Sequence, residues 1–320
     1  MKTLEAVSIG DVRAAADRIT DLALRTPLVR LNVDDAQSRI YLKLENLQPI
    51  GSFKVRGAGN AIRAANPDDL ADGVYTASAG NMAQGLAYAA RRIGVPCSAV
   101  VPDHAPQTKL DAIERLGATV VKVPFDEWWQ VILTHSFDGL PGRMIHPVSN
   151  PDVMAGNGTI AVEILEELPE LDAIVVPYGG GGLSCGIAAA AKAMKPGVKV
   201  YAAEIETAAP LAASLKAGEP REVDYTPSFV DGCGSKSLLA EMWPLARQLL
   251  DGSLVVSLQQ TAEAIRLLAE RNRIIAEGAG AVSVAAALAG KAGHGTIACI
   301  VSGGNIDAAK LAVILGGAVP

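Results

Sequence analysis

The sequence has few of the residues that mark metal sites, disulfide frameworks or nucleic-acid surfaces. Its four cysteines lie far apart without a C-x-x-C pair, and its four histidines show no metal-ligand spacing. Acidic residues outnumber basic ones, 34 to 28, and the net charge of −6 provides no basic stripe. These absences argue against a disulfide scaffold, a zinc site and a nucleic-acid partner. They favour reduced thiols and therefore a cytoplasmic protein.

Long apolar runs are also missing. No uninterrupted stretch reaches the length of a bilayer, and residues 1–6 lead into an amphipathic pattern instead of the apolar region of a signal peptide. We therefore expect no membrane partner.

Half of the 320 residues are apolar, only 4% are aromatic and 32 are glycine, which is typical of a packed α/β enzyme. From about residue 73 the pattern alternates between strand and helix, which predicts βαβ units and parallel sheets. Residues 126–144 interrupt this rhythm, and a second series begins near Asn157. We predict open α/β lobes in two domains: a small inserted domain at 73–148, and a large cofactor-binding domain formed by 1–72 plus 149–320.

Lys54 lies in the small and apolar stretch GSFKVRGA at residues 51–58. Desolvation beside Phe53 and Val55, and the like charge of Arg56, should lower the pKa of its amine. A neutral lysine amine is a nucleophile that forms Schiff bases with carbonyl compounds. The alternative is a surface lysine on the first turn of a helix.

Three loops follow predicted strands and precede predicted helices, which is where open α/β sheets bind ligands. The first is SAGNM at residues 78–82, whose backbone N–H groups could face a carboxylate. The third is SGGN at residues 302–305, where the Ser302 hydroxyl could bond a heteroaromatic ring nitrogen. Either loop could also be an ordinary turn.

The second loop is a run of four glycines at residues 179–182, ahead of a predicted helix. Such a run can form an anion nest, and the helix dipole adds attraction for phosphate. A rival interpretation is a dinucleotide fingerprint in which Glu204, about twenty residues on, binds ribose. The spacing is G-x-G-x-x-x-G, so that match is partial and leaves a nucleotide-binding oxidoreductase as an alternative.

Together these stretches resemble the pyridoxal-phosphate enzymes of fold type II (tryptophan synthase β-like), and within them the threonine/serine dehydratase and serine racemase family. The resemblance covers nearly the whole chain. It rests on LKLENLQP at 42–49, GSFKVRGA at 51–58, SAGN at 78–81, HP at 146–147, MAGNGT at 154–159, the four glycines, EGAG at 277–280 and SGGN at 302–305.

The resemblance implies a role for each matching position. Lys54 is the Schiff-base lysine and the catalytic residue, with Phe53 beside the cofactor. Asn81 bonds the pyridoxal 3′-oxygen, Ser302 is the partner of the pyridine nitrogen, and Gly234 and Glu277 lie near the ring. The phosphate loop comprises Gly179, Gly180, Gly181 and Gly182. The loop that binds the substrate carboxylate comprises Ser78, Ala79, Gly80, Asn81 and Met82.

The implied activity is a pyridoxal-phosphate-dependent ammonia-lyase that removes the β-hydroxyl of an L-β-hydroxy amino acid, giving a 2-oxo acid and ammonia. Threonine, serine, hydroxyaspartate and phenylserine remain open as substrates. The alternative on the same fold is an amino-acid racemase, but Ala79 stands where similar serine racemases have a serine that acts as the second base. We expect Ser78 to point elsewhere. Many relatives have histidine at Met82, so no proton transfer is assigned there.

The resemblance also implies a homodimer and raises the question of a cation. Related enzymes hold a divalent or monovalent cation with an acid such as Glu204 and a backbone carbonyl such as that of Ala208, but Pro210 replaces the usual third ligand. Glu204 could equally be a strand-end carboxylate paired with a lysine. Trp128 and Trp129 could line the substrate entrance or pack the small domain, and adjacent aromatics favour packing.

Overall fold

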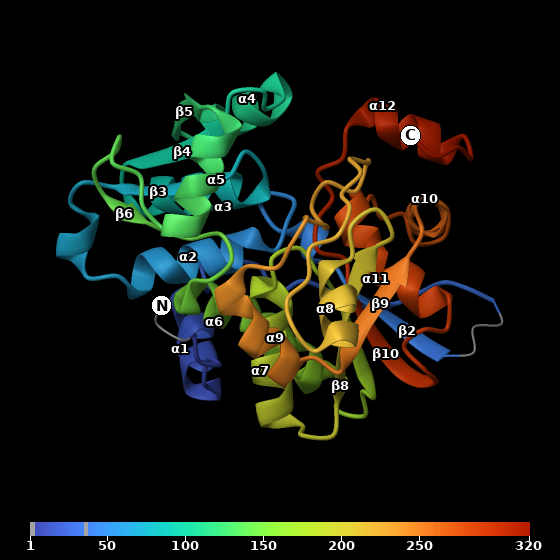
Figure 1. Ribbon diagram of the computed structural model, residues 1–320. Helices are drawn as coiled ribbons and strands as arrows, with labels where there is room; N and C mark the ends of the chain where they lie inside the picture. Colours follow the sequence, from blue (N-terminus) through green and yellow to red (C-terminus); the bar gives the residue numbers. More distant parts are fainter. Residues whose placement is uncertain (1–3, 35–37) are drawn as a thin grey trace.

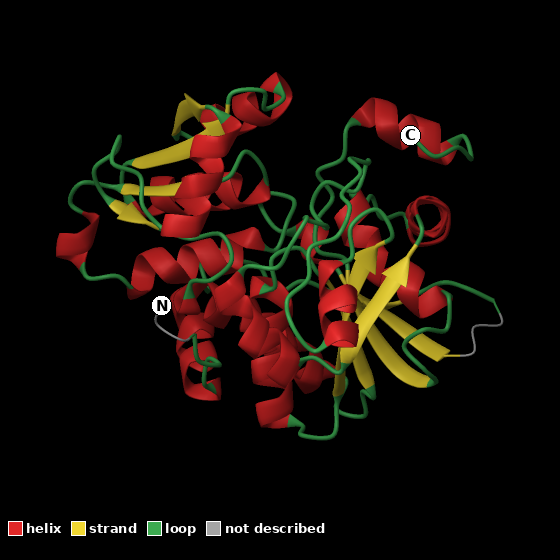
Figure 2. Cartoon of the chain, viewed as in Figure 1, coloured by secondary structure: helices red, strands yellow, loops and turns green. Residues whose placement is uncertain are grey.

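The computed structural model describes residues 4–34 and 38–320. The first three residues, part of the N-terminal segment that we interpreted as amphipathic, lie outside the described residues. Two separate sheets organise the described chain, with helices between and around them (Figures 1 and 2).

The larger sheet has six strands in the order β1-β2-β10-β7-β8-β9. Every neighbouring pair is parallel except β1 and β2. Its strands are β1 (Leu28–Arg30), β2 (Ser38–Lys43), β7 (Ala173–Pro177), β8 (Lys199–Ile205), β9 (Gly252–Val256) and β10 (Gly295–Ile300). All residues of β7 are buried, as expected for a central strand covered on both faces.

The smaller sheet is entirely parallel, in the order β5-β4-β3-β6. Its strands are β3 (Val74–Ala77), β4 (Cys97–Pro102), β5 (Thr119–Val123) and β6 (Arg143–Met144). The fold is therefore the expected α/β class with parallel-rich sheets, and the strands of the smaller sheet all fall between residues 74 and 144.

Helices fill the space between the sheets and cover their outer faces (Figure 1). Helix α6 packs against both α2 and α7, and α2 also packs against α3, so these four helices form the centre of the molecule. The α-helices are α1 (Ile9–Arg18), α2 (Lys54–Ala64), α3 (Asn81–Ile93), α4 (Gln107–Arg115), α5 (Phe125–Thr134), α6 (Pro151–Glu167), α7 (Gly182–Met194), α8 (Pro210–Ala217), α9 (Trp243–Leu249), α10 (Leu258–Leu267), α11 (Gly278–Leu288) and α12 (Ala308–Leu315). Short 3₁₀ turns are η1 (Glu45–Leu47), η2 (Pro67–Leu70) and η3 (Ala240–Met242), and η4 (Leu268–Asn272) is a π-helix.

Local sequence signals explain several helix ends. Ser8 caps α1 and Ser257 caps α10, each in a reciprocal capping box. Gly94 ends α3 with a left-handed φ of 81°. Within the two described ranges, no helix combines the length and apolarity needed to cross a membrane.

The structure corrects the prediction for residues 126–144, which we interpreted as a break in the strand–helix rhythm. Most of that segment's first half is helix α5, which follows β5 directly after Pro124. The sequence analysis also missed β9 and α8. Strand β9 begins at Gly252 and pairs with β8 at the edge of the larger sheet, where its residues are mostly half-buried and lack a strong apolar pattern.

Candidate functional site

A cavity of about 600 Å³ opens between the two sheets. It receives the loop after β3 and the N-terminus of α3 from the smaller sheet, and the loops after β7 and β10 from the larger one. Parallel strands place their carboxyl ends along one edge, which is why three loops far apart in sequence meet at one cavity. Its volume lies within the roughly 300–1,000 Å³ of typical ligand pockets.

Every residue that we predicted to bind cofactor or substrate lines this cavity. The set comprises Phe53, Lys54, Ser78, Ala79, Gly80, Asn81, Met82, Gly179, Gly180, Gly181, Gly182, Gly234, Glu277 and Ser302. Their individual roles remain predictions. Ser78 contributes to the lining, so the expectation that it lies away from the ligand is not supported, and its hydroxyl accepts the Gly80 N–H at 3.2 Å.

Lys54 is the first residue of α2, and its amine reaches into the cavity region, where Nζ donates to the carbonyl oxygen of Pro147 at 3.0 Å. Burial lowers the pKa of Lys54 from 10.5 to about 8, against the opposing negative charge of Glu277. The amine is therefore half neutral near pH 8, where an exposed lysine would be almost fully charged. The surface-lysine alternative does not fit this environment.

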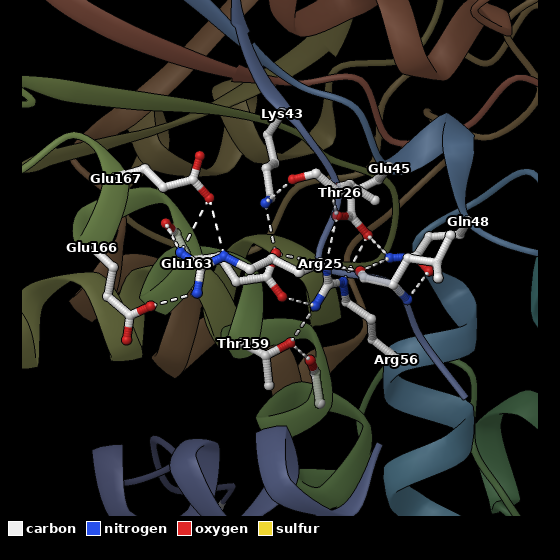
Figure 3. Close-up of polar contacts among 12 residues, drawn as sticks. Arg25, Thr26, Lys43, Glu45, Gln48, Arg56, Thr159, Glu163, Glu166 and Glu167 are labelled. Carbon is white, nitrogen blue, oxygen red and sulfur yellow. Dashed lines mark hydrogen bonds and ion pairs between the residues drawn. The ribbon is translucent and has the colours of Figure 1, made fainter. Parts of the chain in front are cut away.

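Arg56 does not act on Lys54 as a like charge, which corrects our prediction. Its guanidinium turns away into a buried network, where Nε donates to Glu45 Oε2 at 2.7 Å and Nη1 donates to Glu163 Oε1 at 2.6 Å (Figure 3). Lys43 Nζ lies 2.6 Å from the other oxygen of Glu163. Two carboxylates and two cations thus neutralise one another and tie α2 to α6, directly behind the lysine.

The four glycines form a cradle at the N-terminus of α7. No side chain caps this helix, and among the described residues no hydrogen-bond acceptor pairs with the N–H groups of residues 179–182. Gly181 has a left-handed φ of 102°. A Cβ at Gly182 would lie 2.5 Å from the Val148 carbonyl oxygen, so only glycine allows this close approach. Open N–H groups at a helix N-terminus are suited to a phosphate.

The opposite end of the cavity joins loops of the two sheets through amide side chains. Asn81 Nδ2 donates to Glu277 Oε1 at 2.9 Å, and Asn305 Nδ2 donates to Asn81 Oδ1 at 2.8 Å. Burial raises the pKa of Glu277 from 4.5 to about 7, although the Asn81 hydrogen bond opposes the shift. Asn305 had no predicted role of its own; its place in the SGGN loop was the available signal.

Glu204 and Ala208 do not line the cavity. Glu204 is fully buried; its Oε1 accepts the Leu211 N–H at 2.9 Å, and its Oε2 accepts the Ala212 N–H at 2.7 Å. Ser253 Oγ donates to the same Oε2 at 2.6 Å. The carboxylate thus caps α8 and pairs with a serine, not with the lysine that we considered. In residues 4–34 and 38–320, no group of three or more His, Cys, Asp or Glu side chains is placed to hold a metal ion.

Trp128 and Trp129 both line the cavity while packing against the hydrophobic core on their other side. Our preference for packing alone was therefore incomplete. The sequence analysis missed two further lining residues, Lys109 of α4 and Asp231, which form an ion pair at the cavity. Nothing in the local pattern around either residue indicates this pairing across 122 positions.

The uncapped glycine cradle and the lysine amine of lowered pKa line one cavity of about 600 Å³, and this combination fits pyridoxal phosphate. Residues 19–303 match the family described as pyridoxal-phosphate dependent enzyme. The chain belongs to this family. It is 39% identical to the L-threonine ammonia-lyase of Thermotoga maritima over 94% of this chain and 76% of that protein. It is 35% identical to a serine racemase of Oryza sativa subsp. indica over 94% of this chain and 92% of that protein.

Solved structures agree with the assignment. Serine racemase from Dictyostelium discoideum superimposes with a TM-score of 0.84 at 36% identity, covering 94% of this chain and 99% of that one. The predicted fold type II resemblance and the pyridoxal-phosphate cofactor are thereby confirmed for this pyridoxal-phosphate-dependent enzyme. The dinucleotide alternative loses its ribose-binding acid, because both carboxylate oxygens of Glu204 are bonded within the protein.

Proposed function

We propose that this enzyme is an ammonia-lyase that removes the β-hydroxyl of an L-β-hydroxy amino acid and releases a 2-oxo acid and ammonia. One observation carries the proposal. The cavity lining contains a lysine amine whose pKa is lowered to about 8, while the loop position expected for a second base is the methyl group of Ala79.

Different residues of the chain have different roles in this reaction. The neutral form of the Lys54 amine, which the lowered pKa of about 8 makes available, takes the Cα proton of the substrate. No side chain caps α3, so its first N–H groups are available for the substrate carboxylate, as those of α7 are for phosphate. Ser302, two residues after β10, lines the cavity, and its hydroxyl would bond the ring nitrogen of the cofactor. The bound cofactor supplies the electron sink for the Cα–H electron pair.

The reaction needs no reactant besides the amino acid, because the water released in the elimination equals the water used in the hydrolysis. The Cα–H and Cβ–O bonds break and water leaves, giving an enamine. Its imine form takes up one water and releases ammonia, so the net products are a 2-oxo acid and ammonia. Inversion needs an acid that returns the proton on the face opposite Lys54, and the methyl group of Ala79 supplies none at the position expected for that acid, which favours elimination.

The test is chiral chromatography of reactions of the holoenzyme with L-serine and L-threonine, with the 2-oxo acid measured in parallel. We expect oxo acid and ammonia in equal amounts, with little or no D-amino acid. D-enantiomer formed at a rate comparable to that of oxo acid would overturn the proposal.

A racemase is the second candidate, because Ser78 also lines the cavity and carries a hydroxyl. Its Oγ accepts the Gly80 N–H, which leaves its proton free to be donated. Ser78→Ala distinguishes the two candidates, since it would abolish D-product formation in a racemase and leave elimination by a lyase in place.

We also propose a two-domain division at 73–148, a homodimer and a cytoplasmic location. The smaller sheet lies within 73–148, which supports the division. Helix α12 lies at the periphery of the molecule (Figure 1). Its Val313 and Leu315 are exposed, which supports the dimer, and all four cysteines are buried free thiols, which supports the location. Light scattering of the purified protein tests the dimer, and a single-subunit mass would contradict it.

A further inference from the structure

One face of α5 lines the cavity with large apolar side chains. Phe125, Trp128, Trp129 and Ile132 are spaced i, i+3, i+4 and i+7, so they share one side of the helix, and all four line the cavity. We call these four residues the α5 face. The chain has only three tryptophans, and two of them are here.

The aromatic rings of this face contact one another. Phe125 and Trp128 have ring centroids 5.6 Å apart, and those of Trp128 and Trp129 lie 6.2 Å apart, both tilted pairs. Ile132 is buried in the core beneath them. The wall is therefore a supported surface suited to a flat apolar group, and it is more extensive than the methyl group of threonine needs.

The Trp128 Nε1 atom is buried by the protein alone, so it does not face the cavity. Trp128 therefore contributes the apolar part of its ring to the lining and no hydrogen bond to a ligand.

The cations of the cavity do not favour an acidic substrate side chain. Among the described lining residues, the cationic or titratable nitrogens other than Lys54 belong to Lys109 and His104. Lys109 is paired with Asp231, and His104 lies against Asp103 and beside the Phe125 ring. A second carboxylate, as in hydroxyaspartate, would meet a lysine that already has an acidic partner and a histidine that is in contact with Asp103.

We propose that the α5 face is the side-chain subsite and that the enzyme prefers β-hydroxy amino acids with a bulky, aromatic β-substituent over threonine and serine. The aromatic ring lies against Trp128 and Trp129. This inference rests on the proposed lyase function for turnover, but its binding part is independent of that function.

Binding is tested with amino acids that lack a leaving group. L-Phenylalanine and L-2-aminobutyrate carry a phenyl ring and a methyl group on Cβ, respectively, and neither has a β-hydroxyl. Calorimetric titration of the holoenzyme should show phenylalanine binding at least about tenfold more tightly. Equal affinities, or tighter binding of 2-aminobutyrate, would overturn the subsite.

Turnover separates this proposal from the lyase proposal. L-threo-Phenylserine should have a kcat/KM at least about tenfold above that of L-threonine. Oxo acid from threonine but not from phenylserine would overturn the substrate preference and keep the lyase. Phenylalanine bound tightly without oxo acid from either hydroxy amino acid would overturn the lyase and keep the subsite.

Substitutions on α5 test which side chains produce the preference for phenylserine over threonine. Trp129→Leu should reduce the preference for phenylserine over threonine about tenfold, because it removes the ring and keeps apolar volume. Trp128→Phe should keep the preference within about twofold, since it retains an aromatic ring and removes an N–H that does not face the cavity. Trp243→Leu is the matched control, a tryptophan that packs on the core away from the cavity lining. An equal loss of preference in the control would overturn the assignment.

Discussion

Asn81 donates from Nδ2 to Glu277 Oε1 at 2.9 Å and lies 3.2 Å from Oε2, which joins two residues 196 positions apart. Asn81 begins α3 beside the smaller sheet, and Glu277 precedes α11 against the larger one. This contact holds a negative charge near the amine of Lys54, whose pKa it raises against the effect of burial. The cavity therefore sets the reactivity of its lysine through residues of both sheets.

The first prediction concerns the rate at which cofactor-free protein takes up pyridoxal phosphate. The neutral amine is the reactive form, so the rate should rise with pH with a midpoint near 8, the pKa of Lys54. In Glu277→Gln the negative charge that favours the ammonium form is gone, so the pKa of Lys54 falls and the midpoint moves to lower pH. Stopped-flow measurement of the visible absorbance of the bound cofactor reports this rate.

The cofactor's own titration affects wild type and variant equally. The difference between their two pH midpoints therefore reports the change in the pKa of Lys54. Glu241→Gln is the matched control, because Glu241 is paired with His135 and does not line the cavity. An unchanged midpoint in Glu277→Gln would show that this carboxylate does not act on the amine.

The second prediction is that Arg56→Leu destabilises the cofactor-free protein by about 3–5 kcal/mol, because Glu45 and Glu163 lose their shared buried cation. Arg63→Ala, on the same helix, removes an exposed pair with Asp21 and should cost much less than Arg56→Leu, because solvent screens that pair. Urea unfolding of both variants measures the difference. Similar losses of unfolding free energy in the two variants would mean that the buried network contributes no more to stability than an exposed ion pair.

The contrast between Lys54 and Arg56 shows what the sequence could predict. The small, apolar setting of Lys54 and the three loops after strands are local patterns, and they predicted most of the cavity residues that we named. Gly234 and Glu277 came only from the family resemblance. The partners of Arg56 could not be found this way, because Glu163 lies 107 positions away and its approach depends on how α6 packs against α2. Helix α5 was missed although its apolar residues recur at helical spacing. That spacing could not show that this side of the helix faces a cavity, because the cavity depends on how the two sheets pack.

The third prediction tests the glycine cradle. Gly181→Ala forces a side chain into a left-handed φ and places its Cβ 3.1 Å from the Tyr178 hydroxyl. We expect weaker retention of pyridoxal phosphate, by about tenfold or more, as well as lower stability. Gly94→Ala is matched for backbone strain, with φ of 81° and nothing within 4 Å of the added Cβ. Equal cofactor affinity in both variants, measured by equilibrium dialysis, would contradict the cradle.

The fourth prediction is that chelation leaves activity unchanged within about twofold, because the oxygens of Glu204 are already bonded to two N–H groups and a hydroxyl. The protein is dialysed against EDTA and assayed with and without added Mg²⁺ or Mn²⁺. Activity that falls on chelation and returns with the metal would show that Glu204 and the Ala208 carbonyl hold a cation after all.

The last prediction is that Ala79→Ser introduces racemisation. Inversion at Cα needs a proton acid on the face opposite Lys54, and Ala79 lies in the cavity with a methyl group that can neither donate nor accept a proton. A hydroxyl at this position supplies such a group, and general acid–base catalysis contributes roughly 10²–10⁴-fold. We therefore expect the ratio of D-serine to 2-oxo acid formed from L-serine to rise at least about tenfold above wild type. Chiral chromatography measures this ratio, and Ser78→Ala in the same loop is the control that should not raise it. A ratio that stays at the wild-type level in a folded, cofactor-loaded Ala79→Ser protein would mean that this loop does not face the substrate Cα from the side opposite the lysine.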